Sequence, residues 1–241
     1  MYGMYGYGYG YGLDPTIILV LIGVALSLWA QGRVNSTFSR YSRVRSMTGM
    51  TGAEAARRLL NAQGIYDVTV QPIAGELTDH YDPRTKTVNL SQSVYGATSV
   101  AAIGVAAHEC GHAMQDNEGY APLRFRSALV PVANFGSSLS WPLILLGLVF
   151  GGLGSPLVEI GILMFSLAVL FQLVTLPVEY NASARAVRLL DAQGILAGEE
   201  VNGTRKVLNA AALTYVAAAA TSILQLLRLI ILFGGRNRRD R

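Results

Sequence analysis

Residues 129–177 read LVPVANFGSSLSWPLILLGLVFGGLGSPLVEIGILMFSLAVLFQLVTLP, and this stretch decides the fold. It contains two apolar runs, 129–150 and 157–177, on either side of the short turn GGLGSP. At a rise of about 1.5 Å per residue, a helix made from either run would cross a bilayer core of about 30 Å. Because the turn is short, we predict a helical hairpin over 127–177 that returns the chain to the side from which it entered the membrane.

The composition of the whole chain also indicates a membrane protein. Of its 241 residues, 51% are hydrophobic and only 14% are charged, whereas an ordinary soluble domain has about 25% charged residues. The single cysteine excludes a disulfide framework and a cysteine-rich metal site. The net charge of +4 comes from 17 arginines and 2 lysines, and the arginines cluster beside apolar segments. This distribution is typical of membrane orientation, so we expect no nucleic-acid partner. Residues 1–12 are a low-complexity Tyr/Gly tail, predicted to be flexible.

Two further apolar segments lie before and after the hairpin. Residues 13–31 have a proline in the predicted first helical turn and are just long enough to span a membrane. Arginines follow this segment, and basic residues favour the cytoplasmic side, so we expect the polar region 32–126 to be cytoplasmic. A fourth crossing by the Ala-rich run 207–233 would put the basic tail 234–241 outside, against this tendency. The sequence therefore leaves open whether that helix spans the membrane, lies in it or re-enters it, or packs on the catalytic part. It also leaves open whether the first segment spans.

The polar region 32–126 is predicted to be a small juxtamembrane α+β part. Helical periodicity predicts a helix over 51–62, with a threonine cap and a glycine stop. Short strands are predicted at 68–71 and 87–90, and the sequence LTDHYDPRTK between them has the Asp-Pro chemistry of a tight turn. A helix of small residues is predicted over 99–114.

The strongest chemical signal is the sequence His108-Glu109-Cys110-Gly111-His112 in that last helix. Histidines four residues apart lie on one helical face, so both imidazoles can bind one metal ion. Glu109 is next to the first histidine and can accept a proton from the attacking water. A satisfied pair of core histidines is disfavoured, because an acid and two imidazoles would be costly to bury without a partner. Cys110 is expected to pack away from the histidines, and Gly111 to allow another helix to approach closely.

A catalytic zinc site also needs a third protein ligand and one open position. Glu179 is the best candidate, because the hairpin brings the predicted ligand helix and loop, 178–206, back to the side of His112. Four other acids fit less well, because two follow the first helix too closely and two lie in a predicted loop: Asp116, Glu118, Glu199 and Glu200. We therefore predict one Zn²⁺ per chain on His108, His112 and Glu179, a ligand set that would also take cobalt or manganese.

Three segments of the chain resemble the YugP-like family of neutral zinc metallopeptidases, which are prokaryotic membrane proteins. The segments are HECGHAMQ, GELTDHYDPRTKTVNLS and PVEYNASARAVRLL, and the resemblance extends over about residues 13–233. It implies a mainly α, multi-pass membrane protein in which a small α+β catalytic part of the gluzincin type adjoins the membrane hairpin. It also implies zinc on His108, His112 and Glu179, with Glu109 as the base.

The same resemblance gives further expectations for the site. The EYNAS segment is similar to the third-ligand helix of HtpX-like membrane proteases, which have an Asp four residues after the ligand Glu. Here that position is Ser183, whose hydroxyl would orient a ligand histidine less strongly. In such enzymes an edge strand ahead of the zinc helix pairs with the substrate, and Thr87–Ser91 stands in that place. His80, Tyr180 and Asn89 are candidates for contacts to the substrate or the oxyanion, although a turn residue and a packing aromatic are simpler interpretations of the first two.

These observations predict a zinc metalloendopeptidase of the cell membrane that cleaves membrane or membrane-associated proteins. A quality-control role rests only on analogy with HtpX-like enzymes. The expected partners are the lipid bilayer and a protein or peptide substrate, and the sequence does not indicate an oligomeric state. Two alternatives stay open. One is a site-2-type intramembrane protease, which has HExxH inside a transmembrane helix and an Asp ligand. The other is a zinc-binding scaffold without activity, which would not need Glu109.

Overall fold

The computed structural model describes residues 14–152 and 155–234. The predicted tail 1–12 and all but the first residue of the basic tail 234–241 lie outside these residues. The described helices are α1 (Ile17–Tyr41), α2 (Gly52–Ala62), α3 (Gln92–Tyr95), α4 (Val100–Asn117), α5 (Ala121–Gly151), α6 (Pro156–Ala192) and α7 (Glu199–Phe233). The described strands are β1 (Thr69–Ile73), β2 (His80–Asp82) and β3 (Thr87–Ser91).

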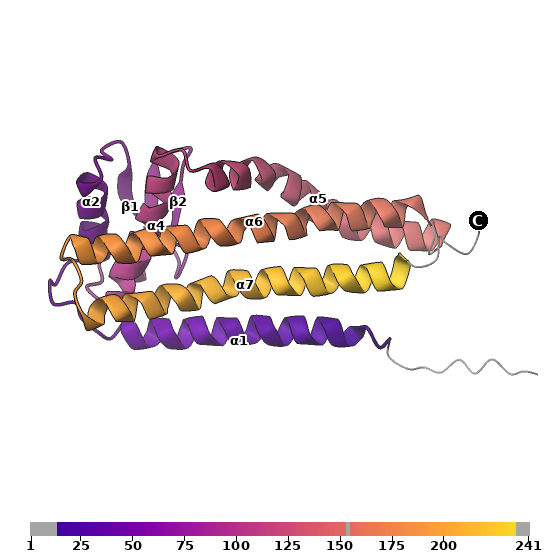
Figure 1. Ribbon diagram of the computed structural model, residues 1–241, viewed down its shortest axis with the longest axis horizontal. Helices are drawn as coiled ribbons and strands as arrows, with labels where there is room; N and C mark the ends of the chain where they lie inside the picture. The colour runs from indigo at the N-terminus through magenta and orange to yellow at the C-terminus, as the bar shows by residue number, and fades with distance from the viewer. Residues whose placement is uncertain (1–13, 153–154, 235–241) are drawn as a thin grey trace, which may run out of the picture.

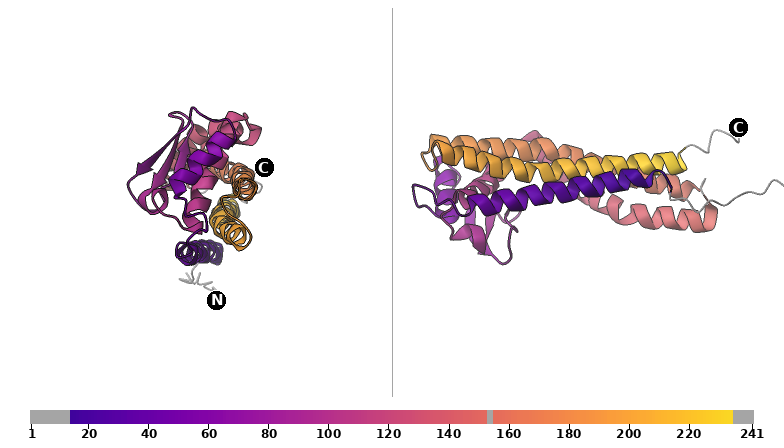
Figure 2. Two further views of the ribbon diagram at one scale, coloured as in Figure 1. Left: turned by 90° about the vertical axis from the view of Figure 1, so that its left-hand side faces the viewer. Right: turned by 90° about the horizontal axis from the view of Figure 1, so that it is seen from below.

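The long helices α1, α5, α6 and α7 run along the longest axis of the molecule, and the small α+β part lies at one end of them (Figure 1). The helix α1 runs toward this end, the α5–α6 hairpin leaves it and returns, and α7 runs away from it (Figures 1 and 2). By length and composition, all four are able to cross a membrane. The predicted mainly α membrane fold with a small α+β part is therefore confirmed.

Small residues hold the membrane hairpin together where α5 and α6 meet. A Cβ atom on Gly136 would lie 2.7 Å from the carbonyl oxygen of Met164, and one on Gly161 would lie 2.8 Å from that of Ser140. In lipid, apolar side chains gain little by contacting each other instead of the bilayer, so helices associate mainly through close packing. Glycine at these two positions permits that packing, and the predicted hairpin is present.

The helix α6 continues without a break from the membrane hairpin into the polar part. It passes Pro177, where the apolar run ends, and includes Glu179. The sequence predicts a boundary at this proline, but the structure has one helix. The position of Glu179 is consequently set by the hairpin itself. The helix α1 likewise continues beyond residue 31 to Tyr41.

The helix α7 is the antiparallel neighbour of α1 (Figure 1). The hydroxyl of Thr221 donates to the carbonyl oxygen of Gly23 at 3.0 Å, and Arg228 donates to the carboxylate of Asp14 at 3.3 Å. These contacts follow one another along the two helices, so α7 accompanies α1 as a fourth crossing would.

The strand β3 is the centre of a three-stranded sheet, with β1 parallel on one side and β2 antiparallel on the other. The expectation that Thr87–Ser91 is an edge strand is therefore wrong. The segment before β3 is predicted from its sequence to be a turn, but it also contains the short strand β2, which covers that edge. The turn itself follows β2, where the backbone N–H of Arg84 donates to the carboxylate of Asp82 at 2.9 Å.

The sheet is fixed on α4 by one carboxylate. Asp116, near the end of α4, accepts hydrogen bonds from the hydroxyl of Tyr81 at 2.8 Å and from the ammonium group of Lys86 at 2.9 Å. Burial and the hydrogen bond to the Asp116 carboxylate raise the pKa of the Tyr81 phenol, so the phenol remains a donor at neutral pH. The buried face of α4, including Ile103 and Cys110, forms the core with α2 and the sheet.

Candidate metal centre

The second half of α4 packs directly on α6. A Cβ atom on Gly111 would lie 2.6 Å from the carbonyl oxygen of Ala182, a contact that real Cβ atoms do not make. Only glycine lets the two helices come this close, as the sequence analysis predicted for Gly111. The side chains on either side of this contact therefore meet between the helices.

This contact brings His108, His112 and Glu179 together. Nε2 of His108 lies 3.2 Å from Oε2 of Glu179, and Nε2 of His112 lies 3.6 Å from the same oxygen. The three candidate ligand atoms all lie within 4.8 Å of one another. Glu179 is only 2% exposed, so the group lies at the base of the site. Two imidazoles and one carboxylate are a donor set of catalytic zinc sites, and these residues fit that metal.

Hydrogen bonds on the far side of each imidazole orient the two rings. Nδ1 of His108 lies 3.1 Å from the hydroxyl of Ser183, and Nδ1 of His112 lies 3.0 Å from Oε1 of Gln115. The amide nitrogen of Gln115 donates to the backbone of α6 and to Oδ1 of Asn181, each at 2.9 Å. Because the amide oxygen can only accept, Nδ1 of His112 is the donor in this contact, and Nε2 is left as the ring atom that would bind a metal. This role of Gln115 was not predicted.

The charges in the group favour an ionised carboxylate. Burial alone would lower the pKa of His112, but the hydrogen bond to Glu179 and the nearby charge of Glu109 raise it above the ordinary value of 6.5. Glu179 lies just past the apolar run of α6. Burial works to raise its pKa, but the hydrogen bonds with His108 and His112 outweigh burial and hold the pKa well below its usual range. The carboxylate is therefore ionised at neutral pH, the form that binds a cation.

A cavity of about 730 Å³ opens in front of these three residues. Glu109 lines this cavity and is 7% exposed. The other walls come from β2 and the turn after it, from the first turns of α5, and from α7. Val130 and Pro131, which belong to the apolar run 129–150, also line the cavity. The cavity therefore extends from the edge of the sheet to the membrane hairpin.

Two polar side chains in this cavity were not predicted. Tyr215, on α7, lines this cavity together with Glu179. Nη2 of Arg126, on α5, lies 3.8 Å from Oε1 of Glu179, and its Nε is buried with no hydrogen-bond partner among the described residues. Tyr215 is the one tyrosine in the Ala-rich run 207–233, and this isolated polar aromatic is the sequence feature that could have indicated it. The sequence does not show that this face of α7 meets α4.

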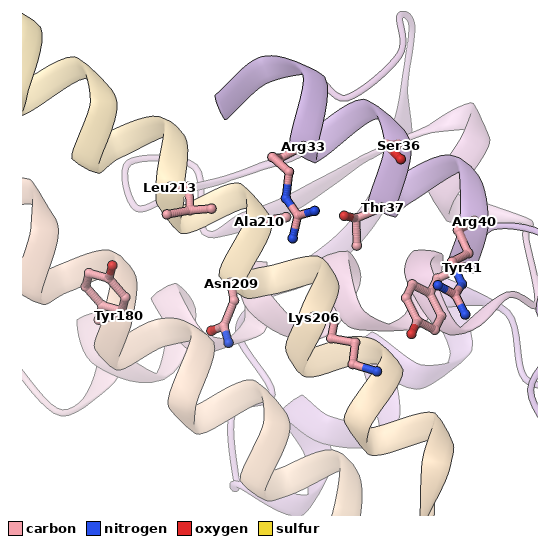
Figure 3. Close-up of a pocket in the computed structure, with 10 residues that line it drawn as sticks. All are labelled: Arg33, Ser36, Thr37, Arg40, Tyr41, Tyr180, Lys206, Asn209, Ala210 and Leu213. Carbon is pink, nitrogen blue, oxygen red and sulfur yellow. The ribbon is translucent and has the colours of Figure 1, made fainter. Parts of the chain in front are cut away.

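Of the other predicted contacts, the structure brings only His80 to the cavity. Both of its ring nitrogens have partners, since Nδ1 lies 2.9 Å from the carbonyl oxygen of Thr78 and Nε2 lies 3.2 Å from Nδ2 of Asn89. Asn89 is buried in the sheet, where Gln71 also donates to it at 2.7 Å. Tyr180 lines a different pocket (Figure 3), because neighbouring residues on a helix point about 100° apart. Neither Tyr180 nor Asn89 lines the cavity of the metal centre.

The acids that were weighed against Glu179 are engaged elsewhere. Glu118 pairs with Arg185 at 2.7 Å, and Asp116 binds the sheet. Glu199 and Glu200, which were predicted to lie in a loop, are in the first turn of α7. Within the part of the chain that the structure describes, His108, His112 and Glu179 form the group that could hold a metal ion.

Comparison with known proteins agrees with this geometry. A family model described as "Putative neutral zinc metallopeptidase" matches residues 16–234, a range that includes every described helix and strand. The chain is 50% identical over 217 residues to "Putative membrane protease YugP" of Bacillus subtilis (strain 168). This match covers 90% of the present chain and 96% of the relative. No solved structure matches the chain.

Proposed function

Because this chain belongs to the "Putative neutral zinc metallopeptidase" family, we propose that it is a membrane-bound zinc endopeptidase with its metal on His108, His112 and Glu179. The meeting of these three ligand atoms at the base of a cavity that also contains Glu109 carries the proposal. Zinc, one ion per chain, would supply Lewis acidity to the scissile carbonyl and the attacking water.

Glu109 is the proposed general base. It follows His108 on α4, and its side chain lines the cavity where a peptide would lie. Its carboxylate accepts a proton from the attacking water and delivers a proton to the leaving amine. A structural metal site would not need such a group, so the position of Glu109 favours an enzyme over an inactive scaffold.

Tyr215 and Arg126 are the proposed donors to the carbonyl oxygen on which negative charge develops. A phenol and a guanidinium are both hydrogen-bond donors at neutral pH. They reach the cavity from α7 and α5, and the buried Nε of Arg126 has no other partner among the described residues. A substrate oxygen between them would satisfy these donors and be stabilised by them.

Tyr215→Phe is expected to lower kcat by about 10²–10³-fold, the usual cost of removing one such donor. The ring remains, so the zinc content and KM should stay close to those of the wild type. Peptide hydrolysis by the detergent-purified protein measures the effect, and Tyr66→Phe, at an exposed site, is the control. If Tyr215→Phe instead lost zinc in proportion to its activity, Tyr215 would only support Glu179.

The substrate is proposed to bind as an extended strand along β2. This strand is at the edge of the described sheet, and its three residues line the cavity. Backbone pairing with a strand edge is a general way to hold a peptide without reading its sequence. Because the membrane hairpin forms another wall, membrane or membrane-associated proteins are the proposed substrates. A role in quality control is proposed by analogy alone.

A site-2-type intramembrane protease is less well supported. The HExxH sequence lies on α4, which is not one of the four candidate spans among the described helices. The third acid in the group is also a glutamate, not the aspartate of that class.

The metal centre is proposed to face the cytoplasm, because the arginine cluster after the first apolar run lies at that end of the molecule. A cysteine in place of Tyr66, which is 78% exposed in the α+β part, should react with an impermeant maleimide only after the cells are opened. A cysteine in place of Phe150, which is 81% exposed near the hairpin turn, should react in intact cells. Cys110 does not interfere, because burial raises the pKa of its thiol. The reverse labelling pattern would invert the orientation.

A further inference from the structure

A second pocket, of about 590 Å³, is lined by residues of α1, α6 and α7 (Figure 3). Its walls are α1 and Tyr180 of α6, and its floor is the face of α7 that carries Lys206, Asn209, Ala210 and Leu213. These four positions recur every three or four residues, so they share one face of the helix. Leu208 and Tyr215, which line a cavity at the metal centre, are on the opposite face. The helix α7 therefore separates the two sites.

The chemistry of this pocket selects an anion. Three cations line it, Arg33 and Arg40 from α1 and Lys206 from α7, and no acidic side chain does. In Figure 3, Arg33 extends from α1 toward α7, with Lys206 lying nearer the start of α7. None of the three takes part in a salt bridge with another described residue. Like charges around one pocket repel one another, and a bound anion would remove that cost. Thr37 and Asn209 add a hydroxyl and an amide that can donate to it.

The position of the pocket points to the headgroup level of a bilayer. Arg33 follows the first apolar segment, 13–31, and Lys206 comes directly before the run 207–233. Tyr180 comes just after the run 157–177 of α6. The ends of three apolar runs, on α1, α6 and α7, therefore lie at this pocket. Basic and aromatic residues at such boundaries lie among lipid headgroups.

We propose that this pocket binds the phosphate headgroup of an anionic glycerophospholipid, with one acyl chain lying along α7 over Leu213. The shared chemistry is a phosphate held by arginine and lysine, which a soluble phosphate compound would also satisfy. A lipid is favoured because the pocket lies at the apolar boundary of the helices and has Ala210 and Leu213 in its floor. Basic pockets between transmembrane helices are typical sites for anionic headgroups. The proposal does not depend on the peptidase activity.

The test uses the full chain purified in a neutral detergent. Without an anionic bilayer surface, non-specific attraction of the arginines to lipid headgroups does not contribute to binding. Native mass spectrometry would measure the retention of phosphatidylglycerol and of phosphatidylcholine with the same acyl chains. We expect one phosphatidylglycerol to bind per chain. Phosphatidylcholine should bind at least about tenfold more weakly than phosphatidylglycerol. Arg33→Gln/Lys206→Gln should weaken phosphatidylglycerol binding about 10- to 30-fold. The matched control Arg43→Gln/Arg45→Gln removes the same charge from exposed positions just beyond the pocket and should change it less than about twofold.

Zinc content and the thermal midpoint report whether each variant is folded, and Lys206→Glu provides a second, single substitution at an exposed position. The proposal is overturned if both pocket variants, once shown to be folded, bind phosphatidylglycerol as the wild type does. Equal losses in the pocket and control variants would also overturn it, as would equal binding of the two lipids. Displacement of the lipid by inorganic phosphate at about its own concentration would assign the pocket to a soluble phosphate compound instead.

Discussion

Glu109→Gln is expected to lower the rate of peptide hydrolysis by about 10²–10⁴-fold, the usual contribution of a general base. The amide is nearly isosteric with the carboxylate, so the fold should be unchanged. It cannot accept a proton from the attacking water at neutral pH, so the chemical step loses its base. Because Glu109 is not one of the three grouped ligand residues, the zinc content should remain close to one ion per chain. Hydrolysis of casein or a peptide, with elemental analysis of the same sample, measures both quantities.

The matched control is Glu76→Gln, which makes the same change at an exposed loop position. Its rate and zinc content should equal those of the wild type. A zinc-loaded Glu109→Gln variant with wild-type activity would refute the mechanism, although the metal site could still be right. If the wild type and Glu109→Gln both bind zinc but neither hydrolyses peptides, the scaffold alternative is favoured.

Glu179→Ala is expected to abolish activity through loss of the metal. The substitution leaves two imidazoles and removes the ionised carboxylate that lies within 3.2 and 3.6 Å of their Nε2 atoms. Loss of a partner that only orients a ligand costs about 10–100-fold in metal affinity, so loss of the ligand itself should cost more than about 100-fold. Competition with a chelator, followed by elemental analysis, measures the affinity.

Two neighbours of Glu179 on α6 provide graded controls. Ser183→Ala removes the hydroxyl that lies 3.1 Å from Nδ1 of His108, so it should lower zinc affinity by about tenfold. Tyr180→Phe changes a side chain that faces the other pocket, so it should leave zinc affinity unchanged. Full zinc occupancy in Glu179→Ala would remove Glu179 from the ligand set, and a large zinc loss in Tyr180→Phe would show that the α6 surface is assigned incorrectly.

Much of the molecule is predictable because it depends on local pattern. The apolar runs 129–150 and 157–177 and their short turn predict the hairpin, since a bilayer-length apolar helix has few alternatives in lipid. Helical spacing alone puts His108 and His112 on one face. The hairpin then leads to Glu179, because a chain that crosses twice must return to its starting side. Each of these inferences needs only the sequence and the geometry of a single helix or hairpin.

The sequence by itself therefore determined the membrane class, the hairpin, the histidine pair and the acid that lies beside it. Only the tertiary structure decided which faces of separate helices meet. The close contact of Gly111 with α6 aligns the site, and the rotation of α7 places Tyr215 in one cavity and Lys206 in another pocket. It also decided that β2, three residues long, covers the edge of β3. The physical reason is that periodicity specifies a face relative to its own helix axis, whereas the rotation of one helix against another is set by packing between residues far apart in the chain.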